Sequence, residues 1–271
     1  MAFPDVLALD FDGVLCDGLR EYFQVSWRTY QQLWPDDASP EPPAGLAEQF
    51  YTVRPVVETG WEMPIVVRSL RLGATPEQLL ADWPTERDRR IAEEQRDRAQ
   101  LSSTLDGLRD QWIREDLRGW LDLHRFYPGT IERVQEAIAN GTQVFIITTK
   151  EARFAQQLLQ RAGLRLDAAL IFGKGVKRPK AETLRILRDR AIAETGQSPR
   201  IWFVEDRLET LLKIAPASDL ATVELFLADW GYNTPAARSQ AAASDRLNLI
   251  TLSQFAQDWS TWLQADTLTA H

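Results

Sequence analysis

The chain has 271 residues, of which 44% are hydrophobic and 26% charged, a composition typical of a globular protein with one large or two modest domains. The formal net charge of −8 argues against a general nucleic-acid binder, and the single Cys16 excludes an internal disulfide and suits a reducing compartment. No apolar stretch reaches the roughly 20 residues that cross a bilayer, and the sequence opens without a basic leader segment. We therefore expect a soluble, cytoplasmic protein.

The first predicted element is a strand over residues 6–9, whose continuous apolar run is typical of a parallel strand covered on both faces. Asp10 and Asp12 follow it directly, and carboxylates two residues apart point to the same side of an extended chain. Gly13 lets the backbone turn sharply after them. One carboxylate could attack phosphorus while the other handles a proton. The alternative is an ordinary acidic turn after a strand.

Residues 17–125 contain no convincing strand and show amphipathic helical patterns separated by Pro-rich joints. Residues 35–45 are predicted to form a surface loop. The segment from Thr85 to about Leu123 is dense in charged residues with apolar residues at helical intervals, which predicts one or two long solvated helices. The sequence thus predicts a helical domain, residues 16–125, inserted after the first strand of a core domain formed by residues 1–15 and 126–271.

The rest of the core alternates short apolar runs with helical patterns, which is typical of an α/β fold with a parallel, Rossmann-like sheet flanked by helices. The predicted strands are residues 144–147, 169–172, 201–204, 223–227 and, more weakly, 247–250. A C-terminal helix is expected to begin near Ser253.

Two of these strands lead into candidate phosphate-binding residues. Thr148 ends the strand 144–147, where parallel sheets bind ligands, although threonine also simply suits strands. The stretch 173–180 places two glycines and four cations before a predicted helix, which suits an anion site or, alternatively, a solvated basic loop. Lys180 is preferred because it opens the helix, with Lys177 as the main rival and Lys174 a further possibility.

Glu205 and Asp206 end the strand 201–204 and would crowd Asp10 and Asp12 if the strand ends converge. Like charges at such a spacing are costly without a counter-ion. Either the nearby lysines neutralise these acids, or the acids hold a divalent cation such as Mg²⁺, which prefers carboxylate and phosphate oxygens.

Four motifs in this order resemble those of the haloacid dehalogenase superfamily of phosphohydrolases, particularly its members related to phosphoglycolate phosphatase and β-phosphoglucomutase. They are, in chain order, Asp10-x-Asp12-Gly13-Val14, the strand-end Thr148, Lys180 before a helix, and the pair Glu205-Asp206. The turn at Pro128-Gly129 and the segment 227–233 are similar as well. The helical insertion matches in placement and character, an arrangement called a C1 cap.

The resemblance implies a Mg²⁺-dependent phosphatase that acts through an aspartyl-phosphate. Asp10 would be the nucleophile, Asp12 the acid and then the base, and Thr148 and Lys180 would hold the phosphoryl group. The resemblance also implies sets of phosphate contacts and metal ligands. The phosphate contacts would be Phe11, Thr149 and Lys177, and the metal ligands Asp10, Asp12, Asp206 and Glu205. The chain departs from the family pattern at two positions. Glu209 stands where many members have a second aspartate, and Thr149 stands where an asparagine often follows the strand-end hydroxyl residue.

Because Asp12 has no use in attack on carbon, the chain resembles a phosphate-ester enzyme more than a dehalogenase. The expected partner is a small phosphorylated metabolite, with no nucleic acid or membrane, and the expected state is a monomer or homodimer. Arg54 and Trp61 are candidate substrate contacts in the cap, although the stronger explanation is a surface ion pair for Arg54 and packing in the cap core for Trp61. The alternatives are a phosphomutase of the same superfamily and a catalytically weak binding or scaffold module.

Overall fold

The computed structural model describes residues 3–37 and 39–263, which fold as two compact units. The core unit comprises residues 1–17 and 126–271, and the helical unit comprises residues 18–125. Residues 264–271 of the expected core domain lie outside the described residues.

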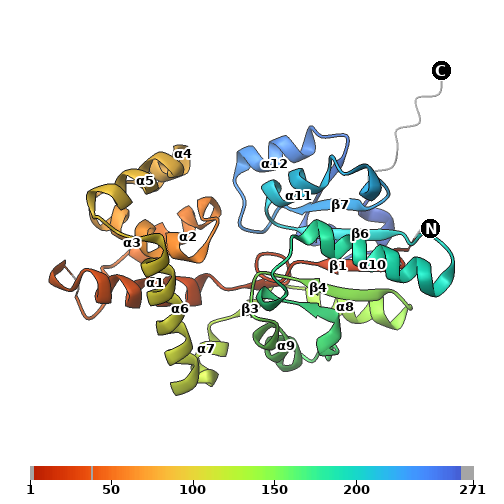
Figure 1. The fold of residues 1–271 in the computed structure, drawn as a ribbon, viewed down its shortest axis with the longest axis horizontal. Helices are drawn as coiled ribbons and strands as arrows, with labels where there is room; N and C mark the ends of the chain where they lie inside the picture. Colours follow the sequence, from red (N-terminus) through yellow and green to blue (C-terminus); the bar gives the residue numbers. More distant parts are fainter. Residues whose placement is uncertain (1–2, 38, 264–271) are drawn as a thin grey trace. The chain divides into compact units, whose positions relative to one another are not determined.

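The core unit is built on a six-stranded sheet in the order β5-β4-β1-β6-β7-β8, in which every pair of neighbours is parallel (Figure 1). The strands are β1 (Val6–Leu9), β4 (Gln143–Ile147), β5 (Ile171–Phe172), β6 (Ile201–Glu205), β7 (Glu224–Ala228) and β8 (Leu247–Ile250). Val6 of the central strand β1 pairs with Gln143 on one side and with Ile201 on the other. This register aligns the ends of β1, β4 and β6, so the residues that follow them emerge at one edge of the sheet.

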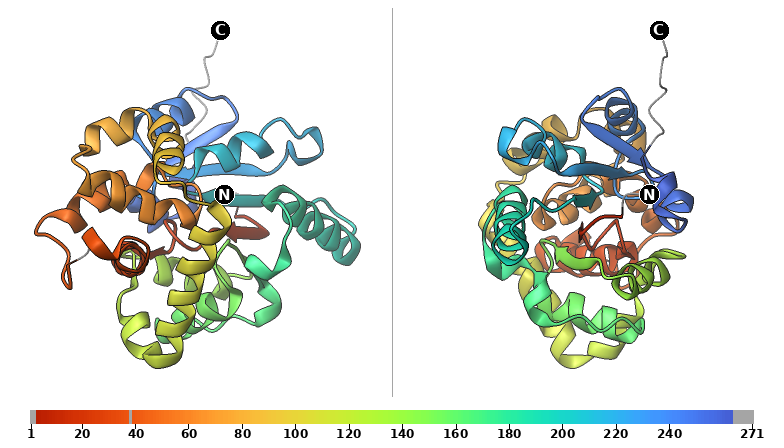
Figure 2. Two further views of the ribbon diagram at one scale, coloured as in Figure 1. Left: turned by 60° about the vertical axis from the view of Figure 1, so that its left-hand side comes forward. Right: turned by 90° about the vertical axis from the view of Figure 1, so that its right-hand side faces the viewer.

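Helices cover both faces of this sheet (Figure 2), which explains why its strands are continuously apolar. One face buries Ala8, Phe203 and Leu225 against α10, α11 and α12. On the other, Trp202 packs with Phe226 and Trp262 at centroid distances of 5.2 and 5.4 Å. The core helices are α8 (Thr130–Ala139), α9 (Ala152–Arg161), α10 (Lys180–Thr195), α11 (Leu208–Ile214), α12 (Pro235–Ala242) and α13 (Leu252–Phe255). The predicted parallel α/β core is confirmed.

The strand predicted over residues 169–172 is shorter than expected. Ala168–Leu170 form a 3₁₀ turn, because the Asp167 side chain accepts a hydrogen bond from the Ala169 N–H at 2.9 Å. Only Ile171 and Phe172 then remain to pair with β4.

The helical unit contains α1 (Leu19–Leu33), α2 (Leu46–Val53), α3 (Met63–Arg71), α4 (Pro76–Ala81), α5 (Trp83–Glu93), α6 (Arg98–Glu115) and α7 (Leu117–Asp122). The expectation of one or two helices over 85–123 was wrong, because three helices lie there. Asp97 and Asp116 interrupt the pattern: their carboxylates accept hydrogen bonds from the N–H groups of Gln100 and Gly119 and so begin α6 and α7.

Two short strands, β2 (Cys16–Asp17) and β3 (Arg125–Phe126), lie where the chain leaves and re-enters the core unit, at the limits of the segment expected to lack strands. Among the described residues, no helix combines the length and the apolar content needed to span a bilayer.

Candidate active site

Asp10 and Asp12 lie in the loop that follows β1. The Phe11 N–H donates a hydrogen bond to Asp10 Oδ1 at 2.7 Å, which fixes that carboxylate. Gly13 adopts a left-handed φ of +85°, and a Cβ placed on it would lie 2.1 Å from Asp206 Oδ2. Glycine is therefore required both by the turn and by the close approach of the Asp206 carboxylate, which follows β6.

Lys180, the first residue of α10, links two of the acids. Its Nζ lies 2.8 Å from Asp10 Oδ2 and 2.7 Å from Glu205 Oε2. Burial alone would lower the pKa of Lys180, but the negative charges of Asp10 and Glu205 outweigh it and raise that pKa. The lysine therefore stays charged across the physiological range.

The acids at this edge are crowded and buried. Burial raises the pKa of Asp10 to about 7, with Glu205 adding to the effect and Lys180 opposing it. Burial also raises the pKa of Glu205, opposed by Lys180 and reinforced by Asp206. Lys180 contacts two of these carboxyl groups, Asp10 and Glu205, and a divalent cation beside them would favour their charged forms.

Asp10, Glu205 and Asp206 form a cluster with one oxygen of each within 4.8 Å of the others. Carboxylate oxygens are the ligands that Mg²⁺ prefers, so the donor set fits this ion. The Asp206 carboxylate is already oriented, because its Oδ2 accepts the Tyr232 N–H at 2.8 Å. Both Glu205 oxygens accept hydrogen bonds, from Lys180 and from the Arg207 N–H, so in this structure Glu205 mainly holds the lysine.

Thr148 and Lys150 follow β4 at the same edge. Thr148 Oγ1 accepts the Lys150 N–H at 3.1 Å, and Lys150 Nζ lies 3.1 Å from Asp12 Oδ1. Sequence reasoning assigned no role to Lys150. Its position two residues after the strand-end hydroxyl was the one available signal, and the ion pair with Asp12 became visible only in three dimensions.

Of the other sequence candidates in the core unit, Phe11 is fully buried and the remainder lie on the surface. Thr149 is exposed, and Lys174 and Lys177 belong to an exposed turn in which Lys177 has φ +52°. Glu209 is also largely exposed and lies 3.4 Å from Arg207. Among the candidate lysines in 173–180, the preferred Lys180 contacts Asp10 and Glu205.

Comparison with known proteins agrees with this arrangement. The profile of the haloacid dehalogenase-like hydrolases matches residues 4–215. The chain belongs to this family. No curated protein sequence matches it.

Solved structures of the haloacid dehalogenase-like fold resemble this chain along almost its whole length. A predicted phosphoglycolate phosphatase from Lactobacillus delbrueckii has a TM-score of 0.56 at 14% identity, covering 92% of this chain and 95% of its own. A haloacid dehalogenase-like hydrolase predicted in Bacteroides fragilis has a TM-score of 0.54 at 19% identity, with 93% and 99% covered. A predicted β-phosphoglucomutase from Thermotoga maritima has a TM-score of 0.50 at 17% identity, with 93% and 96% covered. At such identities the likeness concerns the fold.

Within the helical unit of this hydrolase, Arg54 and Trp61 have local partners. The Arg54 guanidinium donates to the Val57 carbonyl at 3.0 Å and lies 5.0 Å from the centre of the Tyr22 ring. The Trp61 ring lies beneath Arg98, at 5.1 Å. Both side chains thus contribute to the packing of the helical unit.

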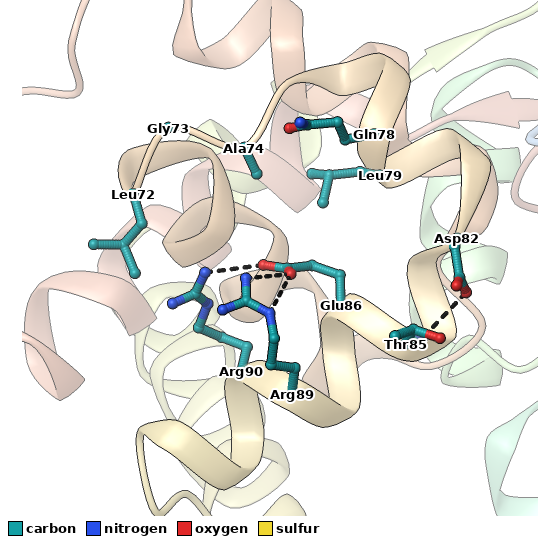
Figure 3. Close-up of a pocket in the computed structure, with 10 residues that line it drawn as sticks. All are labelled: Leu72, Gly73, Ala74, Gln78, Leu79, Asp82, Thr85, Glu86, Arg89 and Arg90. Carbon is teal, nitrogen blue, oxygen red and sulfur yellow. Dashed lines mark hydrogen bonds and ion pairs between the residues drawn. The ribbon is translucent and has the colours of Figure 1, made fainter.

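Two pockets of the hydrolase include none of the clustered acids in their lining. One, of about 430 Å³, is lined by the turn that follows α3 and by α4 and α5 of the helical unit, and there Arg89 and Arg90 both pair with Glu86 (Figure 3). Both arginines of this pocket thus have an acidic partner within it. The other, of about 370 Å³, lies at the amino end of β4, opposite the edge that carries the acids.

Proposed function

We propose that this protein is a Mg²⁺-dependent phosphatase that hydrolyses a small phosphorylated metabolite through an aspartyl-phosphate on Asp10. The observation that carries the proposal is the joining of Asp10, Glu205 and Asp206 around Lys180, with Asp12 two residues after Asp10 at the same edge of the sheet. Family membership and the hydrolase fold support it.

In the first step, Asp10 Oδ attacks phosphorus and the ester bond to the leaving oxygen breaks. Asp12 donates a proton to that oxygen. Lys180 and Thr148 would hold the phosphoryl oxygens, and charge neutralisation of this kind carries most phosphoryl-transfer catalysis. A bound Mg²⁺ would supply further neutralisation between the carboxylates and the phosphoryl group. Asp10, Asp206 and the Asp12 backbone carbonyl would hold it, with Glu205 in support.

In the second step, Asp12 accepts a proton from water, whose oxygen attacks the phosphorus of the aspartyl-phosphate. The bond between Asp10 and phosphorus breaks and inorganic phosphate leaves. Lys150 Nζ lies 3.1 Å from Asp12 Oδ1, and this contact holds the carboxyl group of Asp12 in position. The two lysines thus serve the two aspartates separately: Lys180 contacts Asp10, and Lys150 contacts Asp12.

We further propose that the helical unit acts as a cap that excludes water and selects the leaving group. Arg54 and Trp61 remain its candidate substrate contacts, and Phe11, Thr149 and Lys177 remain candidate phosphate contacts. A monomer or homodimer in the cytoplasm, acting on a free metabolite, is the setting we propose, and the single buried Cys16 suits a reducing compartment.

The test is phosphate release from p-nitrophenyl phosphate and a panel of phosphorylated metabolites, with Mg²⁺ and with EDTA. Asp10→Asn should abolish turnover, whereas Glu209→Gln, which removes an exposed acid outside the cluster, should leave it unchanged. A phosphorylated isomer instead of free phosphate would indicate a phosphomutase. Absence of any turnover by folded, Mg²⁺-loaded wild type would contradict the phosphatase proposal.

A further inference from the structure

Residues 230–233, which follow β7, hold Asp206 through both its side chain and its backbone. The Tyr232 N–H donates to Asp206 Oδ2 at 2.8 Å, and Asn233 Nδ2 donates to the Asp206 carbonyl at 2.9 Å. Asn233 Nδ2 also donates to the Ala228 carbonyl at 2.7 Å, so a single amide connects the ends of β6 and β7.

The orientation of the Asn233 amide is itself determined. Asn233 is buried, with 7% of its surface exposed, and its Oδ1 accepts a hydrogen bond from the Arg238 guanidinium at 3.0 Å. The same Arg238 nitrogen donates to the Asn233 carbonyl at 3.1 Å. Because the arginine can only donate, it fixes Oδ1 on its own side and turns Nδ2 toward the two carbonyls.

The segment is also fastened to the loop that carries the aspartates. Trp230 Nε1 donates to the Val14 carbonyl at 3.1 Å, and the Tyr232 hydroxyl donates to Asp17 Oδ1 at 3.0 Å. A Cβ on Gly231 would lie 2.3 Å from the Asp206 Cβ and 2.6 Å from the Gly13 carbonyl oxygen. Backbone packed this closely leaves the Tyr232 amide little freedom to move away from Asp206.

We propose that Asn233, oriented by Arg238, is a positioning residue that sets Asp206 for the divalent cation. This inference rests on the proposed function, since it concerns the ion that the phosphatase would use. Mg²⁺ requires near-ideal octahedral geometry at about 2.0–2.1 Å, so a small displacement of one carboxylate weakens binding. Loss of a partner that orients a metal ligand typically reduces metal affinity by about 10–100-fold.

The test measures Mg²⁺ binding directly, by isothermal titration calorimetry without substrate, for wild type, Asn233→Ala and Arg238→Met. Asn233→Ala should raise the Mg²⁺ Kd by about 10–100-fold, and Arg238→Met should raise it in the same direction by less. In turnover assays the Asn233→Ala defect should shrink at saturating Mg²⁺, with the substrate KM unchanged. Asn248→Ala is the matched control, because the half-buried Asn248 also donates to a backbone carbonyl of this sheet, but on the outer strand β8.

Thermal melting in EDTA establishes whether each variant is folded. If Asn233→Ala does not fold, Arg238→Met decides the matter, because it leaves Asn233 in place and removes the guanidinium that orients its amide, together with that guanidinium's bonds to the Asn233 and Asp229 carbonyls. Unchanged Mg²⁺ affinity in the folded variants, or an equal loss in Asn248→Ala, would overturn the inference. Wild type that binds Mg²⁺ but releases no phosphate would overturn the proposed function alone, whereas wild type that binds no Mg²⁺ would overturn both.

Discussion

Asp10→Asn should make the metal-free protein more stable at pH 8 while it abolishes activity. The pKa of Asp10 is raised from 3.8 to about 7 in the folded protein, chiefly by burial. Between these values the folded state binds more protons than the unfolded state, so stability falls as pH rises from about 4 to about 7. Above pH 7 the folded protein bears the full free-energy cost of burying the charged Asp10 carboxylate, and a difference of about 3 pKa units corresponds to about 4 kcal/mol. The cost at pH 5 is about 1.5 kcal/mol, because there the unfolded state is mostly ionised.

An asparagine at position 10 carries no charge to bury, so the gain in stability of the variant over wild type should be larger at pH 8 than at pH 5. These figures are upper limits, because Lys180 loses one of its two carboxylate partners in the variant. We expect Asp10→Asn to gain about 1–4 kcal/mol at pH 8, and about 1–3 kcal/mol less at pH 5. Mg²⁺ should stabilise wild type more than the variant, because the ion neutralises the Asp10 carboxylate.

Urea unfolding in EDTA at pH 5 and pH 8 measures this difference. Asp5→Asn is the control, since its partner Arg200 lowers the pKa of Asp5 and an exposed pair of this kind contributes little. This control should lose a small amount of stability at both pH values. A loss of stability in Asp10→Asn at pH 8, or the same change at both pH values, would refute the reasoning.

Three further predictions concern the site. Lys180→Met should lower kcat/KM about 100-fold or more, because a preorganised charge at the phosphoryl group is lost. The control is Lys213→Met, which replaces an exposed lysine and should change kcat/KM little, and steady-state kinetics compare the two variants. Gly13→Ala should lower the free energy of unfolding by about 1–3 kcal/mol and weaken Mg²⁺ binding, because an alanine strains the φ of +85° and its Cβ meets Asp206. If this variant is as stable as wild type, Gly13 does not pack closely against Asp206. Mg²⁺ binding at pH 7 should release about half a proton from Asp10, because the pKa of this carboxyl group is raised to about 7 in the metal-free protein. Calorimetry in buffers of different ionisation enthalpy measures the release, and no release would mean that Asp10 is already ionised.

The sequence predicted the core well because the core follows local patterns. Each buried strand is a short apolar run, and the polar residues that follow β1, β4 and β6 necessarily reach one edge of a parallel sheet. The preference for Lys180 came from its place at the start of a helix, and the structure puts its Nζ against Asp10 and Glu205.

Other features depend on contacts between distant segments and could not be read from local patterns. The ion pair of Lys150 with Asp12 joins residues 138 positions apart, and the contact of Tyr232 with Asp206 requires a particular path after β7. In the helical unit, the division of 85–123 into three helices depends on Asp97 and Asp116, whose carboxylates act as caps and interrupt an otherwise helical pattern.

The most direct test of the central claim is to stop the reaction with acid during turnover of the best substrate and locate phosphoryl groups by peptide mass spectrometry. The mechanism predicts a phosphorylated peptide containing Asp10 in wild type, formed and consumed as phosphate is released, and its absence in Asp10→Asn. Full phosphate release in wild type with Asp10 unmodified at every time, and turnover that persists in Asp10→Asn, would show that water attacks the substrate directly and would contradict the account.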